Sequence, residues 1–251
     1  MAGPAQTEVQ NWLLRALPQD AFAMLGPRLR QIETPKGMTL FDAHQPPPFG
    51  YFFESGLGSV IAEVPSGQAV EIGLYGIDGF GGIPLVLKSD HAPQRLEMQI
   101  GGSAWIVPAA ELSAMLGDSP AVQTLMLRYV QFFMLQSAET CLANALRPIE
   151  ERLARWLLMS HDRMPDDDVP LTQDYLAIML GSARTSVTFS LGSLSQRGAI
   201  RTARGVVRIV DRPLLERIAG DAYGVPEREY NRLIAARFGN GGPAPQVSRQ
   251  R

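Results

Sequence analysis

Between residues 171 and 197, apolar residues recur at helical spacing in two short runs separated by a glycine. The first run contains Leu176, Met179 and Leu180. Thr172 precedes it in the position of an N-cap, because its hydroxyl can accept a hydrogen bond from a first-turn amide. Gly181 then ends the pattern, as glycine does at helix C-termini.

The second run predicts another helix, for which Ser182 is a candidate N-cap and Val187, Leu191 and Leu194 form the buried face. The outward face near its N-terminus carries Arg184, Thr185, Thr188 and Phe189. A helix, a tight glycine turn and a second helix form the helix-turn-helix of DNA-binding proteins, whose second helix enters the major groove. The alternative is a helical hairpin with a solvated basic face.

Two β-prone runs, at residues 200–202 and 206–210, follow Gly198 and flank the turn Ala203-Arg204-Gly205. They predict a β-hairpin wing behind the second helix. From residue 180 to residue 212 there are six arginines and one acid, Asp211. DNA binding needs such a surface, because neutralisation of phosphates supplies much of the affinity.

From residue 34 to residue 108 the pattern changes to short β-prone runs that alternate with turn residues. The runs lie at residues 38–41, 51–53, 59–64, 69–74, 96–100 and 104–107. Strands at this spacing predict a closed β-roll or small barrel. Residues 8–32 and 109–116 are predicted to be helical.

A long helix is predicted to begin at Pro120, because proline is favoured in a first turn. Its apolar stripe is broad and aromatic, and consists of Val122, Leu125, Met126, Tyr129, Val130, Phe132, Phe133 and Met134. We therefore expect residues 120–143 to pack on the β-roll with one side and on a second copy of the helix with the other. The alternative is a helix buried entirely within its own domain.

The predicted organisation is α+β. It comprises an N-terminal β-roll sensor domain with helices (residues 1–116), a dimerisation helix (117–146), a winged helix-turn-helix domain (147–220) and a C-terminal extension (221–251). Pro148 marks the boundary before an amphipathic helix at residues 149–159, and a polar segment at 164–170 precedes the helix-turn-helix. Residues 239–251 are rich in Gly, Pro and Ser, which predicts disorder.

The chain has 251 residues, enough for two cores, and its net charge of -2 hides an asymmetry. Residues 1–146 carry 7 basic and 13 acidic side chains. Residues 147–251 carry 16 basic side chains, all arginine, and 12 acidic ones. The near-neutral total therefore does not argue against nucleic-acid binding by the C-terminal half.

Other chemistry is sparse. Cys141 is the single cysteine, which we expect to be a small buried residue, with an interchain disulfide as the alternative. His44, His91 and His161 lack metal-ligand spacing, so neither a metal nor a cofactor is predicted. No nucleophile elbow, phosphate loop or HExxH motif indicates an enzyme. Without a secretory signal or a membrane-spanning run, we expect a cytoplasmic protein.

With β-roll, long helix and winged helix-turn-helix in this order, the chain resembles the Crp/Fnr superfamily of bacterial transcription regulators. The resemblance covers about residues 20–220 and is strongest at ERLARWLLMSHDR (151–163) and LTQDYLAIMLGSARTSVT (171–188). It is looser at KGMTLF, YFFESGLGSV and GIDGFGGIP. It implies a cyclic-nucleotide-binding-like β-roll, a homodimer on palindromic double-stranded DNA and a small effector, with RNA polymerase as a further partner.

The resemblance also implies roles for single residues. Arg184 falls at the family's base-reading arginine and is expected to bind guanine, while Thr172 and Ser186 fall at phosphate-contacting positions. Thr185 and Phe189 replace a common Glu and a common Arg, so the target sequence should differ from the family's best-known sites. Phe189 can contact a thymine methyl group. The other predicted DNA contacts are Ser182, Thr188 and Arg204.

The effector site departs further from the family. Cyclic-nucleotide-binding members have Gly-Glu, which holds the ribose, and then an Arg followed by a hydroxyl residue. Here Gly81-Gly82 puts glycine in place of the Glu, and Arg95 is followed by leucine. The resemblance thus implies an effector other than cyclic AMP, with Gly81, Gly82 and Arg95 as candidate anion-binding residues. The alternative for Arg95 is a solvated side chain.

The sequence therefore predicts a homodimeric, sequence-specific DNA-binding transcription regulator, and not an enzyme. The rival prediction is a β-roll sensor protein whose winged helix binds another protein instead of DNA. DNA binding should weaken steeply with added salt, whereas protein binding should respond less.

Overall fold

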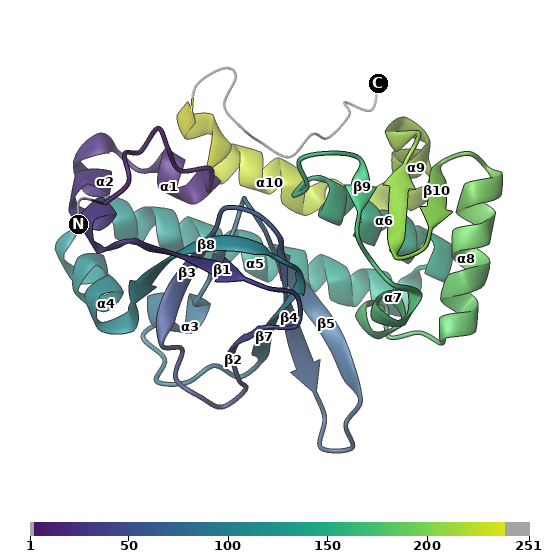
Figure 1. Cartoon of the computed structure of the whole chain (residues 1–251), viewed down its shortest axis with the longest axis horizontal. Helices are drawn as coiled ribbons and strands as arrows, with labels where there is room; N and C mark the ends of the chain where they lie inside the picture. Colours follow the sequence, from purple (N-terminus) through teal and green to yellow (C-terminus); the bar gives the residue numbers. More distant parts are fainter. Residues whose placement is uncertain (1–2, 239–251) are drawn as a thin grey trace.

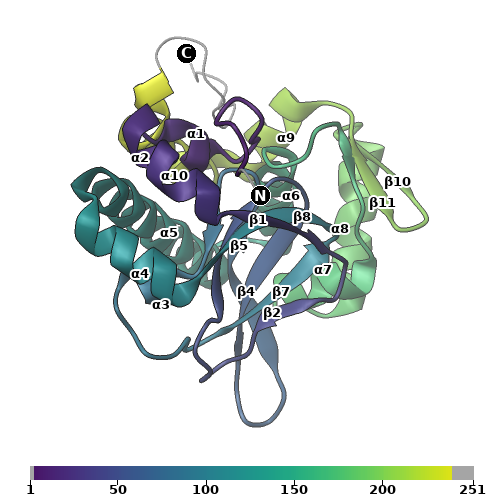
Figure 2. The same cartoon turned by 60° about the vertical axis from the view of Figure 1, so that its left-hand side comes forward.

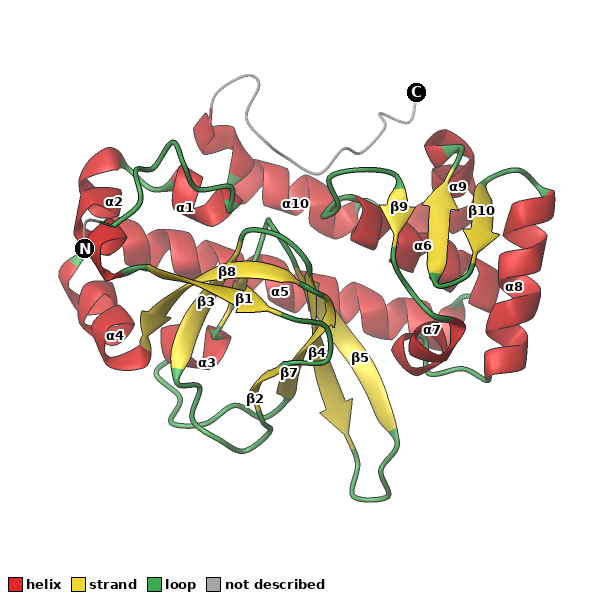
Figure 3. Cartoon of the chain, in the orientation of Figure 1, coloured by secondary structure: helices red, strands yellow, loops and turns green. Residues whose placement is uncertain are grey.

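Strands between residues 30 and 108 form the two antiparallel sheets of a β-roll (Figures 1 and 3). The computed structural model describes residues 3–238. One sheet has the order β1-β8-β3-β6 and the other β2-β7-β4-β5. The strands are β1 (Arg30–Thr34), β2 (Thr39–Phe41), β3 (Phe49–Phe53), β4 (Leu57–Glu63), β5 (Ala69–Tyr75), β6 (Phe80–Gly81), β7 (Arg95–Ile100) and β8 (Gly102–Pro108). The predicted β-roll is confirmed, and its core lies between the two sheets.

Short helices flank this roll, and one sequence prediction there is wrong. Helices α1 (Trp12–Ala16) and α2 (Gln19–Leu25) precede the sheets, α3 (Ile83–Val86) follows β6, and α4 (Ala109–Asp118) follows β8. The helix predicted for residues 8–32 stops at Leu25, because residues 30–34 pair instead with β8, from Arg30 opposite Ile106 to Thr34 opposite Gly102. In that pairing, the backbone N–H and C=O groups of β1 form hydrogen bonds with a strand that is distant in the sequence. Local periodicity carries no information about such a partner.

The first half of helix α5 (Pro120–Leu146) packs in the core of the first domain, through residues between Val122 and Phe133. The predicted apolar stripe is buried except for Met134, which is 61% exposed. The helix approaches strand β5 so closely that a Cβ on Gly73 would lie 2.5 Å from the Phe133 ring. Gln136 is buried on the same face and accepts a hydrogen bond from the Leu74 amide, at 2.7 Å.

The C-terminal domain follows Pro148. It contains α6 (Ile149–His161), β9 (Asp168–Val169), α7 (Gln173–Met179), α8 (Arg184–Gln196), β10 (Ile200–Ala203), β11 (Val206–Ile209) and α9 (Arg212–Ala219). The predicted wing is present as the β10–β11 hairpin. Strand β9 was predicted as part of a polar loop; it pairs with β11, because Val169 is buried and the Asp168 carboxylate binds Arg208 on that strand.

The hydrophobic core of the winged domain extends into the β-roll. Leu57, Leu74 and Ile100 of the β-roll pack in the same cluster as Leu153 and Trp156 of α6. A polar contact accompanies this packing, since the indole N–H of Trp156 donates a hydrogen bond to the Glu71 carboxylate, at 2.7 Å. The winged domain is therefore docked on the β-roll domain of the same chain (Figure 2).

The predicted C-terminal extension contains a helix, α10 (Val225–Leu233), which runs back across α5 toward α1 (Figures 1 and 2). Tyr230 and Ile234 of this segment are buried in the core of the first domain. The disorder predicted for residues 239–251 lies outside the described residues.

Glu71 makes the interface between the domains sensitive to pH. Burial raises the pKa of this carboxyl from 4.5 to about 8, and hydrogen bonds from Ser59 and Trp156 offset part of the rise. A carboxyl with a raised pKa binds its proton more tightly in the folded state, so its contribution to stability is lost as the pH rises from about 4.5 to about 8.

Glu71→Gln should remove this contribution, because the amide keeps the shape of a protonated carboxyl. We expect the stability of the variant relative to the native protein to increase between about pH 5 and about pH 8.5, measured by urea denaturation at both values. Two denaturation curves that shift in parallel with pH would show that Glu71 does not titrate in this range.

Candidate nucleic-acid interface

Helices α7 and α8 form the predicted helix-turn-helix. Thr172 caps α7, since its hydroxyl accepts a hydrogen bond from the Tyr175 amide at 3.4 Å. Ser182 does not cap α8, contrary to the sequence prediction. The chain is still extended at Ala183, which is the N-cap residue, and the Ser182 hydroxyl donates instead to the Leu180 carbonyl, at 3.1 Å. The first-turn amides of α8 therefore have no side-chain cap.

One face of α8 is buried and the other is exposed. The predicted buried residues Val187, Leu191 and Leu194 are inside the domain, together with Ser190. The predicted DNA-facing residues are all exposed: Arg184, Thr185, Ser186, Thr188 and Phe189. Phe189 is 80% exposed, which leaves its ring free to contact an apolar group such as a base methyl.

Two residues of α7 contact the exposed face of α8, and the sequence analysis did not single them out. Arg184 forms an ion pair with Asp174, with 2.8 Å between Nη1 and Oδ1. The Thr188 hydroxyl lies 2.9 Å from the side-chain oxygen of Gln173. Both pairs join the two helices across the turn, at separations in the chain that have no local sequence signature.

A groove of about 530 Å³ separates these helices from the wing. Its lining includes Thr172 and Asp174 of the α7 end, Arg184, and Arg204 at the wing turn. Gly205 has a φ of +75°, which lets the hairpin turn tightly beside Arg204. The wing and the start of α8 thus border one concave surface.

The positive charge of this domain is more localised than its arginine count indicates. Arg197 pairs with Glu150, Arg208 with Asp168, and Arg212 with Asp162. Within residues 3–238, Arg201 and Arg204 have no carboxylate partner. The exposed cationic groups of this domain therefore include Arg201 and Arg204 of the wing, Arg217 of α9 and, beside Asp174, Arg184.

A second cavity, of about 430 Å³, lies between the β-roll and α5, and we call it the apolar chamber. Most of its lining is apolar, and no charged side chain contributes: Phe41, Val60, Tyr75, Ile83, Pro84, Leu87, Ser89, Ala92, Pro93, Gln94, Phe133, Met134 and Ser137. Among the residues that the structure describes, the buried Ser137 hydroxyl has no hydrogen-bond partner. Burial also raises the pKa of Tyr75 far above its ordinary value, so its hydroxyl stays neutral.

The three candidate effector residues do not line the apolar chamber. Gly81 is buried in β6, where a Cβ would lie 2.6 Å from Leu96, and Gly82 has a φ of +132°. The Arg95 guanidinium lies between the carboxylates of Glu97, at 3.5 Å, and Glu63, at 3.8 Å. Neighbouring side chains thus enclose Gly81 and Gly82, and Arg95 is ion-paired; their role in effector binding stays a prediction.

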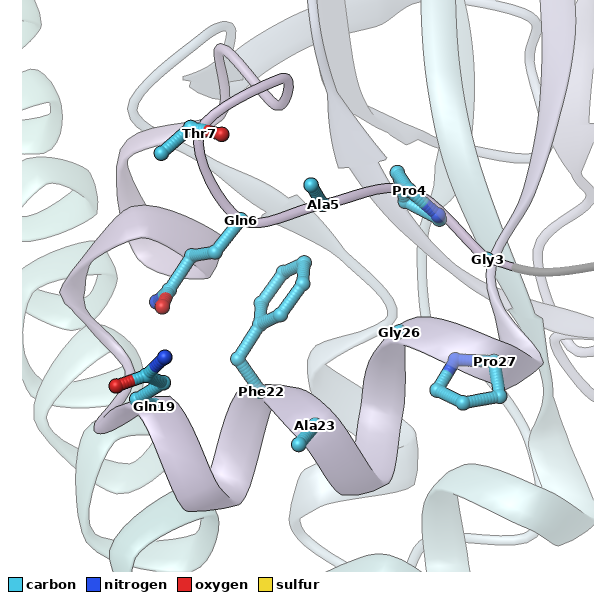
Figure 4. A pocket seen from close by; sticks show the side chains of 10 residues that line it. All are labelled: Gly3, Pro4, Ala5, Gln6, Thr7, Gln19, Phe22, Ala23, Gly26 and Pro27. Atoms are coloured by element: carbon cyan, nitrogen blue, oxygen red, sulfur yellow. The ribbon is translucent and has the colours of Figure 1, made fainter.

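An open cavity near the N-terminus is formed by residues 3–7 and helix α2 (Figure 4). The Phe22 side chain points toward that segment, and no charged residue lines the cavity. Gln6 is already engaged, because its amide donates to the carbonyls of Leu14 and Leu17. In the described part of the chain, no cluster of His, Cys, Asp or Glu could hold a metal ion, and no helix is long and apolar enough to cross a membrane.

Comparison with known proteins agrees with this geometry. Residues 151–218 match the family model of the Crp-like helix-turn-helix domain. The fold is similar to that of FixK2 from Bradyrhizobium japonicum, with a TM-score of 0.68 and 15% identity, over 76% of this chain and 98% of FixK2. No curated protein matches the sequence.

Two further regulators have similar structures. The c-di-GMP-responsive global regulator CLP of Xanthomonas campestris has a TM-score of 0.62 and 17% identity, over 76% of this chain and 99% of CLP. A CRP/FNR-family transcriptional regulator from Thermus thermophilus, TTHA1359, has a TM-score of 0.62 and 20% identity, over 76% of this chain and 98% of that regulator.

The β-roll, the long helix and the winged helix-turn-helix follow one another in the order expected from the resemblance. Residues 151–218 thus match a Crp-like helix-turn-helix domain, and the fold of the chain is similar to that of solved Crp/Fnr-family regulators.

Proposed function

We propose that the protein regulates transcription as a homodimer that reads a palindromic operator. The observation that carries this proposal is the uncapped, exposed start of α8, where Arg184, Thr185, Ser186 and Phe189 stand beside the cationic wing. Arg184 would bind guanine, Thr172 and Ser186 would contact DNA phosphates, and Ser182, Thr188 and Arg204 would be further DNA contacts. Because its ligand is chromosomal DNA, the protein acts in the cytoplasm, with RNA polymerase as a further partner.

A rival function, in which the winged domain binds another protein, fits the surface less well. The exposed α8 residues are mainly hydroxyl-bearing or cationic, and the uncapped amides at the helix start suit an anion such as phosphate. A protein interface would be expected to expose more apolar area at its centre than the ring of Phe189.

Selection from random duplex DNA should enrich a palindrome whose half-sites are about one helical turn apart. On that site, Arg184→Ala should cost about 1–3 kcal/mol, with little loss on random DNA, because base contacts carry the specificity. Arg197→Ala is the matched control, since Arg197 pairs with Glu150 and should change specific binding little. Both are measured by fluorescence anisotropy at fixed salt.

Equal losses for Arg184→Ala on specific and random DNA would make Arg184 a phosphate contact. Failure to enrich any sequence, combined with the absence of salt-dependent binding to duplex DNA, would favour the rival function.

The proposed dimer interface is the face of α5 that the β-roll leaves exposed. Exposed residues follow one another at alternating spacings of three and four, the pattern of a two-stranded coiled coil: Thr124, Leu127, Gln131, Met134, Ala138, Cys141 and Ala145. Leu127 and Met134 are 46% and 61% exposed. Cys141 is exposed, which corrects the prediction that it is buried.

Cys141 tests this interface directly, because a parallel coiled coil places the same seam position of both copies face to face. Mild oxidation of the dilute protein should yield a disulfide-linked dimer on a non-reducing gel. In the control, Cys141→Ser combined with Ala110→Cys moves the thiol to the exposed face of α4 and should give no crosslink. Crosslinking of both proteins alike would indicate random collision, and crosslinking of neither would exclude this seam.

We further propose that the apolar chamber binds the effector, and that the effector is uncharged and largely apolar. The chamber offers no cation for a phosphate and two neutral hydroxyls, Tyr75 and Ser137. Its volume suits a small ligand. Met134 lines both the chamber and the proposed seam, so a ligand there would contact the dimer interface.

The neutral dye N-phenyl-1-naphthylamine, which fluoresces in apolar sites, should bind this chamber and should not be displaced by cyclic AMP. Leu87→Glu places a charge at the half-exposed rim of the chamber and should weaken dye binding about tenfold, because the apolar dye exchanges an apolar contact for a hydrated carboxylate. Val64→Glu is the control at a similarly exposed position outside the chamber. Displacement by cyclic AMP would contradict the proposed ligand class.

A further inference from the structure

Helix α10 lies beyond the family domain, which ends at residue 218. It follows α9 through a short turn at Gly220–Ala222 and crosses back to the first domain, beside α5 and α1 (Figure 2). Glu227 stabilises its start by accepting a hydrogen bond from the Gly224 amide, at 2.9 Å. We call residues 220–234 the latch.

Tyr230 fixes the latch to the sensor domain. Its side chain is fully buried, and its ring packs edge-on against Phe132 of α5 and Trp12 of α1, with centroid distances of 5.0 and 6.0 Å. Its hydroxyl donates a hydrogen bond to the Asp78 carbonyl, at 2.9 Å. Arg128 of α5 donates to the Leu233 carbonyl at the end of the helix, at 3.2 Å.

Asp78 also contacts the winged domain. Its carboxylate accepts hydrogen bonds from Nε and Nη2 of Arg163, at 2.9 and 2.6 Å, just beyond the end of α6. Both side chains are at most 3% exposed. A buried ion pair of this kind must overcome the cost of desolvation, and its fixed geometry favours one arrangement of the two domains.

The other end of the latch is held by the winged domain. Arg212 at the start of α9 binds the Asp162 carboxylate at 2.6 Å, and the Tyr223 hydroxyl donates to the same carboxylate at 2.6 Å. The latch is therefore attached to both domains, and Asp78 is the residue at which it meets Arg163.

We propose that the latch and Asp78 lock the winged domain in one orientation on the sensor domain, and so determine where the recognition helix lies. Apolar packing alone would let the winged domain slide or tilt on the first domain. The hydrogen bonds of Tyr230 and Arg163 to Asp78 have preferred directions and therefore oppose such movement. The lock lies within one chain and does not depend on DNA binding.

The Asp78 turn also connects the lock to the apolar chamber. Tyr75 precedes this turn and Ile83 follows it, and both side chains line the chamber. A ligand that displaces Tyr75 or Ile83 would therefore also move the turn between them, which contains Asp78, the residue that binds Arg163 and Tyr230. The lock is therefore placed to transmit occupancy of the chamber to the winged domain.

Hydrogen exchange measured by mass spectrometry on the full-length protein tests the lock. Tyr230→Ala removes the ring and the hydroxyl, and should raise exchange about tenfold or more in α10, in residues 76–80 and in α6, because all three separate when the domains move. Strands β3 and β8, inside the sensor core, should be unchanged. Arg232→Ala is the control, since Arg232 is exposed on the same helix and forms its ion pair within that helix, with Glu229.

Faster exchange in α10 alone would overturn the proposal, because the domains would then keep their arrangement without the latch. If Tyr230→Ala unfolds the whole chain, Tyr230→Leu retains apolar bulk and is judged by the same criteria. The measurement needs no DNA, so its failure leaves the proposed DNA-binding function untouched, and failure of operator selection leaves the lock untouched.

Discussion

The close packing of α5 on strand β5 is the contact on which the rest of the structure depends. The Phe133 ring fills the space left by the missing side chain of Gly73 and lies 4.8 Å from the Tyr75 ring, and Gln136 binds the neighbouring Leu74 amide. This contact fixes the direction in which α5 leaves the β-roll. The position of the winged domain, the surface available to a second copy and the floor of the apolar chamber all follow from it.

Sequence periodicity predicted the parts of the fold that local spacing controls. Leu176, Val187 and Leu191 identify the faces of α7 and α8, and the runs around Arg204 identify the wing. It could not predict β1 or β9, because these strands exist only through pairing with β8 and β11. The same limit explains why the predicted N-cap at Ser182 is wrong. A serine after a glycine turn is a reasonable N-cap candidate, but the backbone is still extended at the next residue, Ala183, so the helix begins one residue later.

The candidate site was predictable in its residue types but not in its electrostatics. The exposed face of α8 follows from the buried one, whereas the ion pairs of Arg197, Arg208 and Arg212 depend on acids far away in the sequence. Counting charges therefore overstates the cationic surface. In the β-roll, the missing Glu at Gly82 and the missing hydroxyl residue after Arg95 argued against a cyclic nucleotide. That an uncharged chamber is present follows only from the structure, because its lining residues come from distant parts of the sequence.

The return of α10 to the first domain bears on how such a protein can change through recombination. In a modular regulator, a new DNA-binding domain can be exchanged at the single connection after the long helix. Here a graft made at Pro148 would also discard Arg163, Tyr223 and Tyr230, and would leave Trp12, Phe132 and the carboxylate of Asp78 exposed without partners. The two halves of this chain are therefore expected to have evolved as one unit. Chimeras built from it should keep α10 together with the residues of the first domain that it contacts.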